Sequence, residues 1–406
     1  MSKYKFTAIL FAIVAMSCLS FPAATAQTPY SQYGYGTLDD NATGAQRSMG
    51  GTGIGMRNNL QINVMNPASY TAIDSLTFMF DFSADYKASW YEENGTSTEG
   101  QSGGLNYILM QFPLGKRVAA SAGLTPLTHV QYTYGNYISN GSYTRIGEGG
   151  ISQAFAGVAY EPWDWVSLGV NFGYIFGDIQ NAIEVSPEDA DAGAYYKILS
   201  VSDFRFQAGL QLMHTFAKKH DVTLGFVYTL GKPLLGTAAA YATNSDTTSF
   251  NMKSFYSMPH GFGAGVSYVY DKRLTAAVDV RYDLWERAKF FNPNTDSYEK
   301  MSNRMKIAAG LEFRPKLLST SYFDYIRYRI GGYYEQSYIM VGNNHVREYG
   351  ISCGFGFPFR SDKSMLNIGL EYSHRNSSPN RLLSEDHLSV VVSITFNEMW
   401  FWQRKL

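Results

Sequence analysis

In Leu274-Thr-Ala-Ala-Val-Asp-Val-Arg-Tyr-Asp-Leu284, every even-numbered side chain is apolar, whereas the odd-numbered ones include Thr275, Asp279 and Arg281. Because successive side chains of a β-strand point to opposite faces, one face of this segment meets an apolar medium and the other a polar one. Fourteen segments of this kind can be found between Leu76 and Phe396. Repeated alternation behind an export signal is typical of an outer-membrane barrel. The predicted fold is therefore all-β, a transmembrane antiparallel β-barrel of 14 strands.

The first 26 residues have the features of a cleaved secretory signal peptide. Lys3 and Lys5 precede an apolar stretch over 6–16, and Ala24-Thr25-Ala26 provides a cleavage site. Lipoprotein processing at Cys18 is the alternative, although Ala15 stands where such sites carry an aliphatic residue. No later segment reaches about 18 consecutive apolar residues, so we expect no transmembrane helix.

The connections between segments fix the predicted strand count and orientation. Short periplasmic turns alternating with longer external loops are the outer-membrane arrangement, and an even strand number places both termini in the periplasm. The periplasmic turns are expected at 115–116, 161–164, 218–220, 271–273, 315–324 and 360–363, and the largest external loops at 177–195 and 232–259. The strands are expected to begin near residues 76, 104, 117, 151, 165, 200, 221, 259, 273, 302, 324, 346, 364 and 386.

The resulting division of the chain has four parts. Residues 1–26 form the signal peptide, 27–75 an irregular plug (hatch) segment rich in Gly, Asn and Tyr, 76–397 the barrel, and 398–406 a periplasmic tail. All six tryptophans fall at predicted strand ends, where amphipathic rings favour the membrane interfaces. These are Trp90 and Trp285 at external ends and Trp163, Trp165, Trp400 and Trp402 at periplasmic ends.

A short motif before the first strand resembles a family signature. Asn66-Pro67-Ala68 is similar to the Asn-Pro-Ala motif in the N-terminal hatch of long-chain fatty acid transporters, the FadL family. The segments 30–34 (Tyr-Ser-Gln-Tyr-Gly), 47–51 (Arg-Ser-Met-Gly-Gly) and 66–70 resemble the version found in Bacteroidota envelopes. The resemblance implies a 14-stranded barrel plugged by its hatch. The alternative is a turn without a transport role, in which Pro67 fixes the backbone and the Asn66 amide bonds nearby main chain.

The third strand carries a second feature that fits this resemblance. In the family that strand is kinked inward and opens a lateral gap through which apolar ligand leaves. Here it contains Gly123-Leu-Thr-Pro126. Proline cannot donate to a β-ladder, so Pro126 predicts a break in strand pairing. Alternatively, the strand ends at Pro126 and 128–134 belong to a loop.

The polar face of the predicted strands is strongly charged. Unpaired charges removed from water are very costly, so mixed signs predict ion-pair networks that hold the plug. Arginines 281, 327 and 329 are alternatively carboxylate anchors for a ligand. The predicted lumenal network comprises Arg205, Asp279, Arg281, Asp283, Lys306, Glu312, Arg327, Arg329, Glu335 and Glu371.

Catalytic and cofactor motifs are absent from the sequence. The seven histidines are scattered without zinc-ligand spacing, and neither a G-x-S-x-G elbow nor a Walker A motif occurs. Gly51-Thr-Gly-Ile-Gly55 lacks the context of a nucleotide site and is interpreted as a flexible plug turn; Asp39 and Asp40 are interpreted as a solvated pair. We therefore predict no enzyme activity, cofactor or metal. A net charge of -1 argues against nucleic acid as a partner.

Two functions fit these features, and we predict the first, with the second as its alternative. The first is passive uptake of hydrophobic small molecules through a plugged lumen with lateral exit near the third strand. The second is a non-transporting accessory barrel of a multiprotein outer-membrane assembly or secretion complex, motivated by the charged lumen. An open diffusion porin is a third possibility, which a plug would block. The expected location is the outer membrane, with its lipid as a partner.

Overall fold

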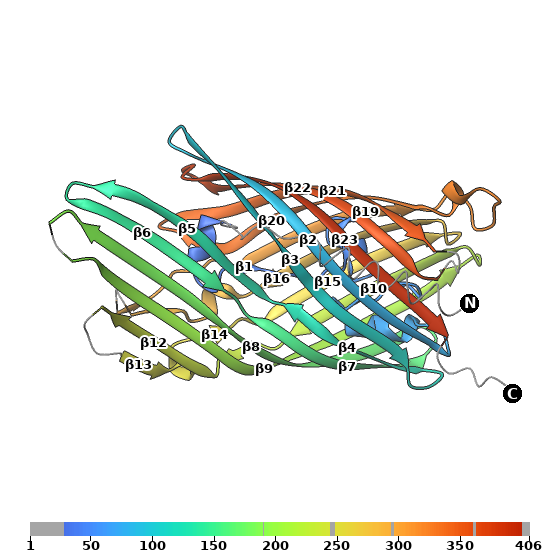
Figure 1. Ribbon diagram of the computed structural model, residues 1–406. Coiled ribbons are helices and arrows are strands. Elements are labelled where there is room, and N and C mark those ends of the chain that lie inside the picture. Colours follow the sequence, from blue (N-terminus) through green and yellow to red (C-terminus); the bar gives the residue numbers. More distant parts are fainter. Residues whose placement is uncertain (1–27, 190, 244–247, 294–295, 360–362, 400–406) are drawn as a thin grey trace, which may run out of the picture.

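The chain folds into a single closed β-barrel with a short irregular segment inside it (Figure 1). The computed structural model describes residues 28–189, 191–243, 248–293, 296–359 and 363–399. The predicted signal peptide, Cys18, Trp400, Trp402 and most of the predicted tail lie outside these residues.

The barrel wall is built from antiparallel strands joined in chain order. Its long strands are β2 (Thr77–Glu93), β3 (Thr96–Pro113), β8 (Val166–Pro187), β9 (Gly193–Phe216), β20 (Arg327–Val341), β21 (Asn344–Pro358), β22 (Met365–Ser378) and β23 (Ser384–Met399). The shorter ones are β4 (Val118–Pro126), β5 (Thr128–Ile138), β6 (Gly141–Gly149), β7 (Ser152–Trp163), β10 (His220–Thr229), β12 (Gly236–Ala242), β13 (Thr248–Asn251), β15 (Gly261–Tyr270), β16 (Leu274–Asp283) and β19 (Arg304–Phe313).

These strands form the predicted 14-stranded barrel, in which four wall strands are composites: β4 with β5, β6 with β7, β10 with β12, and β13 with β15. Pairing of β2 with β23, from Thr77↔Met399 to Glu92↔Ser384, closes the barrel. Outside the wall ladder are β11 (Lys232–Pro233), β14 (Ser257–Met258), β17 (Phe291–Asn292) and β18 (Ser297–Tyr298), with the 3-10 turns η3 (Met252–Ser254), η4 (Trp285–Arg287) and η5 (Tyr322–Asp324). We call the end of the barrel that carries Thr77 and Met399 the turn end, and the opposite end the loop end.

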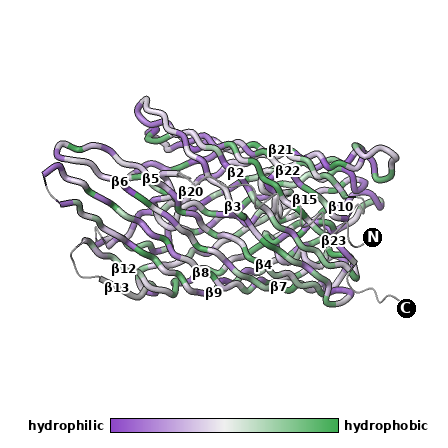
Figure 2. The backbone as a smooth tube through the Cα atoms, in the orientation of Figure 1, coloured by the Kyte–Doolittle hydropathy of each residue, from purple (hydrophilic) through white to green (hydrophobic). Residues whose placement is uncertain are grey.

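Alternation of side chains sorts the two faces of the wall as the sequence predicts. On β16, Val278 and Val280 are exposed on the outside, whereas Asp279 is buried inside. Cys353 lies on the exposed outer face of β21. Figure 2 shows hydrophobic residues along the wall strands and hydrophilic residues at the loop-end tips. The outer face thus presents hydrocarbon to lipid and the inner face presents polar groups to the lumen.

Several strands extend farther toward the loop end than the sequence analysis predicts. The predicted external loop 177–195 is wrong, because β8 and β9 continue through most of it as a paired hairpin. The second strand begins at Thr96 rather than 104, and β6 adds 141–149 to the fourth strand. In the β8–β9 extension the polarity is reversed: Ile179 and Leu199 are buried inside while Gln180 is exposed. A search for apolar residues facing outward therefore misses this hairpin.

The N-terminal segment, residues 28–76, lies inside the barrel (Figure 1). It contains η1 (Pro29–Gln32), β1 (Thr37–Leu38), α2 (Gly44–Arg47) and η2 (Pro67–Ala72). Most of its side chains are buried, and it hydrogen bonds to strands on all sides of the wall, including β5, β9, β16 and β22. Among the described residues, no helix is long or apolar enough to cross a bilayer.

The tryptophans divide into two groups. Trp163 and Trp165 are exposed and stacked at the turn end, and Trp90 is 42% exposed on the outer wall, as expected of interface residues. Trp285 does not fit this prediction. It is buried inside the loop end, where its ring stacks on Tyr338 with centroids 4.3 Å apart. It belongs to an internal apolar cluster that also contains Tyr35 of the N-terminal segment.

Candidate functional site: the filled lumen and the break in the third strand

The Asn66-Pro67-Ala68 motif fixes the N-terminal segment to the inner face of β8 and β9. Asn66 is fully buried; its Nδ2 donates to the carbonyls of Ile54 (2.9 Å) and Leu210 (3.3 Å), and its Oδ1 accepts from Ala68 N–H (3.1 Å). The last bond caps η2, which begins at Pro67. Here the motif joins two parts of the segment to the wall. This structural role is compatible both with a hatch that takes part in transport and with a turn that has no transport role.

Glycines on the wall make this close approach possible. A Cβ atom at Gly209 would lie 2.1 Å from Asn66 Oδ1, and one at Gly169 would lie 2.4 Å from the Pro67 carbonyl carbon. Real Cβ atoms do not approach other atoms so closely, so larger residues at these two positions would push the motif off the wall.

The glycine-rich turn at 51–55 binds a carboxylate of the same chain. Asp279 on β16 accepts hydrogen bonds from the N–H groups of Gly53 (2.5 Å) and Ile54 (2.8 Å), with the Gly55 N–H at 3.4 Å. Successive N–H groups in such a turn form an anion-binding concavity. The turn is therefore occupied by a wall side chain and is fixed rather than flexible.

Asp40 is the centre of the lumenal charge network. Its carboxylate, with only 8% of the side chain exposed, contacts Arg304 (2.7 Å), Lys306 (2.8 Å) and Arg281 (3.1 Å). Arg304, 2% exposed, also binds Glu335 (2.7 Å) and Asp283 (3.3 Å). The interpretation of Asp40 as a solvated residue was wrong, because the segment carries it into the lumen beside three cations.

Other ion pairs place the remaining predicted residues on the inner wall. Glu312 binds Arg327 and Arg329, each at 2.6 Å. Arg47 of α2 joins Glu371 on β22 (3.0 Å) to Asp85 on β2 (3.2 Å). Arg205 donates to Gln153 at 2.9 Å. All ten predicted charges face the lumen, and those around Asp40, the 51–55 turn and Arg47 directly hold the N-terminal segment.

Several residues of the lumenal charge network were not predicted from the sequence. Arg304 has the same strand parity as Lys306, and Arg375 the same as Glu371, so the alternation contained a signal for both. Arg375 binds Glu348 (2.5 Å) and Glu385 (3.3 Å), and Glu385 accepts from the Thr28 hydroxyl at 2.6 Å. Asp40 and Arg47 lie in an irregular segment without periodicity, so no pattern identified them.

The charge of Asp40 has a predictable pH dependence. Burial raises the pKa of Asp40, but Arg304, Lys306 and Arg281 outweigh this effect and hold its pKa well below the usual range. A carboxylate with a lowered folded-state pKa stabilises the fold fully above its unfolded pKa, about 4, and less as pH falls through the folded value. The difference in urea midpoint between wild type and Asp40→Asn should therefore be constant from pH 7 to about pH 5 and shrink below about pH 4. A constant difference down to pH 2 would contradict the pairing.

The third wall strand breaks where Pro126 predicts. β4 pairs with β3 only from Ile108↔Leu124 to Pro113↔Ala119. Beyond Pro126 the chain continues as strand β5, so the alternative of a loop at 128–134 is wrong. β5 pairs on one edge with β6 and on its other edge with β1 of the N-terminal segment, through Thr37↔His129 and Leu38↔Thr128. A Cβ at Gly123 would lie 2.4 Å from the Ile108 carbonyl oxygen, so β4 and β3 approach closely just before they part.

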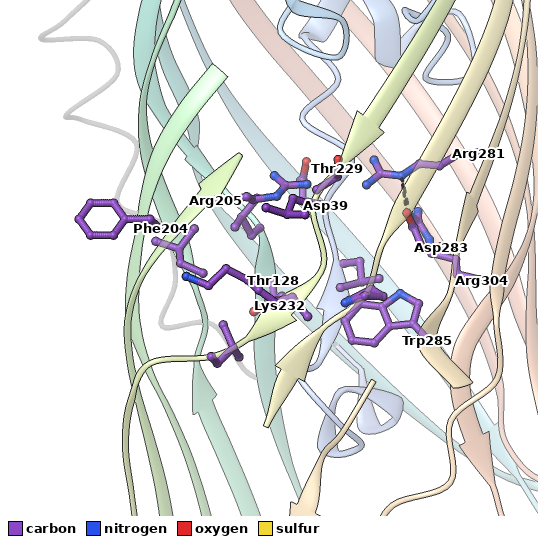
Figure 3. A pocket seen from close by; sticks show the side chains of 17 residues that line it. Asp39, Thr128, Phe204, Arg205, Thr229, Lys232, Arg281, Asp283, Trp285 and Arg304 are labelled. Carbon is purple, nitrogen blue, oxygen red and sulfur yellow. Dashed lines mark hydrogen bonds and ion pairs between the residues drawn. The ribbon is translucent and has the colours of Figure 1, made fainter. Parts of the chain in front are cut away.

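The lumen contains cavities of different character. One of about 60 Å³ lies between Arg205 and Asp39 on one side and Arg281 and Trp285 on the other (Figure 3). A cavity of about 560 Å³ at the turn end includes Arg57, Glu312 and Arg327 in its lining. A third, of about 380 Å³, lies beside the break, and we call it the break cavity. Its lining includes six carboxylates (Asp39, Asp40, Asp85, Glu335, Glu348, Glu371) and four cations (Arg47, Lys87, Lys306, Arg375).

Within the described ranges, no group of three or more His, Cys, Asp or Glu residues is arranged to hold a metal ion. The charged groups of the lumen bind mainly each other and the N-terminal segment. Chemically, the arrangement fixes an internal segment and offers a polar cavity at a discontinuity in the wall.

The barrel and its filled lumen can be compared with known proteins. No curated protein sequence matches the chain. Solved structures with a similar fold include the Pseudomonas putida toluene transporter TodX (TM-score 0.62, 14% identity, covering 89% of this chain and 99% of that one). Others are a Pseudomonas aeruginosa FadL homologue (0.61, 12%, 89% and 99%) and the Ralstonia pickettii toluene transporter TbuX (0.57, 12%, 87% and 97%). These likenesses show the fold of an outer-membrane barrel. The family model BamG matches residues 1–406, and the chain therefore belongs to the BamG family.

Proposed function

We propose that this chain is a non-transporting barrel subunit of a protein complex in the outer membrane. The observation that carries the proposal is the filled lumen: the N-terminal segment occupies it and is bound by buried and partly buried ion pairs from β2, β16, β19 and β22. A barrel with a fixed interior is suited to anchoring partners through its wall and its loop end.

The cavities support the same proposal. Pockets for small molecules usually have about 300–1,000 Å³ and mainly apolar walls with few polar anchors. The partly apolar cavity beside Trp285 has about 60 Å³, whereas those of about 380 and 560 Å³ are mainly polar. Moving a hydrocarbon into such a charged cavity would leave desolvated charges without compensation.

Uptake of hydrophobic small molecules is the second candidate. Two observations favour it: the wall breaks at the third strand, and the structures of similar fold include toluene transporters. In that case Asn66-Pro67-Ala68 would belong to a movable hatch, and ligand would leave the lumen past Gly123 and Pro126. The N-terminal segment would first have to be displaced to create an apolar path.

One experiment separates the two candidates. The protein is extracted in mild detergent from membranes at its native abundance, and co-purifying proteins and bound lipids are identified by mass spectrometry. We expect a stoichiometric complex with other envelope proteins and no ligand in the lumen. A solitary barrel that carries fatty acids or other apolar molecules would refute the subunit proposal and establish the transporter.

A further inference from the structure

The loop-end half of β3 has one unpaired edge. Its whole length pairs with β2, but pairing with β4 stops at Ile108. Within the described part of the chain, residues 96–107 have no strand partner on their second edge. The edge of β5 that would continue that ladder pairs instead with β1, and Thr28 N–H donates to the Gln131 carbonyl nearby. The N-terminal segment has thus replaced β3 as the partner of β5.

Local sequence features create this free edge on both sides. In β3, the pairing with β2 shifts register so that Asn106 is an extra residue, a β-bulge. In the facing strand, Pro126 lacks the N–H needed to continue the ladder. The bulge and the proline lie next to the last paired residues, Ile108 and Leu124.

The environment makes a bare edge costly. Leu105 points outward and is 58% exposed, as the lipid-facing residues of the wall are. Hydrocarbon cannot satisfy unpaired backbone N–H and C=O groups, so a strand edge left open to lipid is costly. Natural proteins cover such edges, and an added extended chain is a common solution.

The break cavity behind the edge indicates what kind of chain fits. Residues 102–106 of β3 line it together with residues 37–39. Its lining has six carboxylates and four cations, and Arg304 and Arg281, outside the lining, complete the pairing of Asp40 and Glu335. Asp39 accepts a hydrogen bond from Asn41 N–H, and the described residues supply no ion pair for it. A side chain that enters this cavity from the edge is therefore favoured if it is basic.

We propose that residues 96–107 of β3 receive an extended segment of a partner protein by strand addition, with a basic side chain directed into the break cavity and apolar side chains directed toward lipid. This inference rests on the proposed function as a complex subunit. Backbone hydrogen bonds to β3 give binding, and alternate side chains of the partner give specificity.

The test maps the register of the added strand. A photo-crosslinking amino acid replaces Gln101, Gly103 or Leu105, three outward positions of the same parity, in cells at native abundance. The control is Ile351, which is 67% exposed on β21, a strand paired on both sides. We expect adducts with one partner from all three β3 positions, with sites in that partner spaced about two residues apart, and none from Ile351.

A charge variant tests the occupant of the cavity. Asp39→Asn should reduce adduct formation at Leu105 roughly fivefold if a basic side chain enters, whereas Asp164→Asn, in an exposed pair with Arg117, should have no effect. An unchanged yield in Asp39→Asn would overturn the basic side chain. Strand addition would be overturned by any of three results: a purified complex without β3 adducts, adducts with lipid alone, or protein adducts at Ile351 equal to those on β3. Each of them would leave the proposed function intact. Absence of any complex would refute the proposed function itself.

Discussion

Asp40→Ala is expected to release the N-terminal segment from the lumen. The substitution leaves Arg304, Lys306 and Arg281 without their shared carboxylate, and Arg304 is 2% exposed. Removing one partner of a buried ion pair typically costs 3–5 kcal/mol, because the remaining charge stays desolvated. We expect a matching decrease in the free energy of unfolding in urea and rapid proteolysis within residues 28–76.

The matched control is again Asp164→Asn. This carboxylate is 87% exposed and pairs with Arg117 at 2.6 Å at the turn end. Surface pairs contribute about 0–1 kcal/mol, so the control should unfold and resist protease like wild type. If Asp40→Ala also behaves like wild type, Asp40 does not hold the segment.

Gly331→Ala is expected to open a conducting path through the barrel. A Cβ at this position of β20 would lie 2.1 Å from the Met49 carbonyl carbon and 2.2 Å from Gly50 N, both backbone atoms of the segment. Gly50 N–H donates to the Ser352 hydroxyl (2.9 Å) and to the Arg47 carbonyl (3.2 Å), so the turn has little freedom to move away. Overpacking costs about 1–3 kcal/mol, and more where backbone must shift.

The measurement is single-channel conductance in planar bilayers. Wild type should be silent because the segment fills the lumen, and Gly331→Ala should give discrete openings. Gly193→Ala is the control, because a Cβ there meets nothing within 4 Å. If Gly331→Ala is silent and its segment still resists protease, the segment adapts to the added methyl group. If wild type conducts, the segment does not seal the lumen.

The barrel could be predicted from the sequence because the side chains of membrane-spanning strands alternate between lipid and lumen with a period of two. Asp279 and Lys306 could be assigned to the inner face from parity alone, and Pro126 located the break from its missing N–H. The extension of β8 near Ile179 was not predicted, because its apolar side chains face inward instead of outward. There the inner wall belongs to the apolar cluster that contains Tyr35. Trp285 was wrongly assigned to the outer membrane interface for the same reason: at the loop end, apolar surroundings occur inside the barrel as well as outside it.

The partners inside the lumen could not be predicted, because an irregular segment has no period. Asp40 and Arg47 are specified by the path of the backbone between β1 and α2, and that path follows from contacts with strands hundreds of residues away. The Asp279 interaction shows the same limit: the glycines at 51–55 were visible, but the carboxylate that they bind is 224–226 residues away.

The position of Arg47 has a consequence for how the barrel forms. It binds Asp85 on the first wall strand and Glu371 on the next-to-last, so it spans the seam at which β2 meets β23. Thr28 makes a similar link to Glu385, 357 residues away. Contacts of such long sequence separation carry a loop-closure cost that slows folding. Because the same segment binds strands on both sides of the seam, closure of the barrel and seating of the segment are coupled.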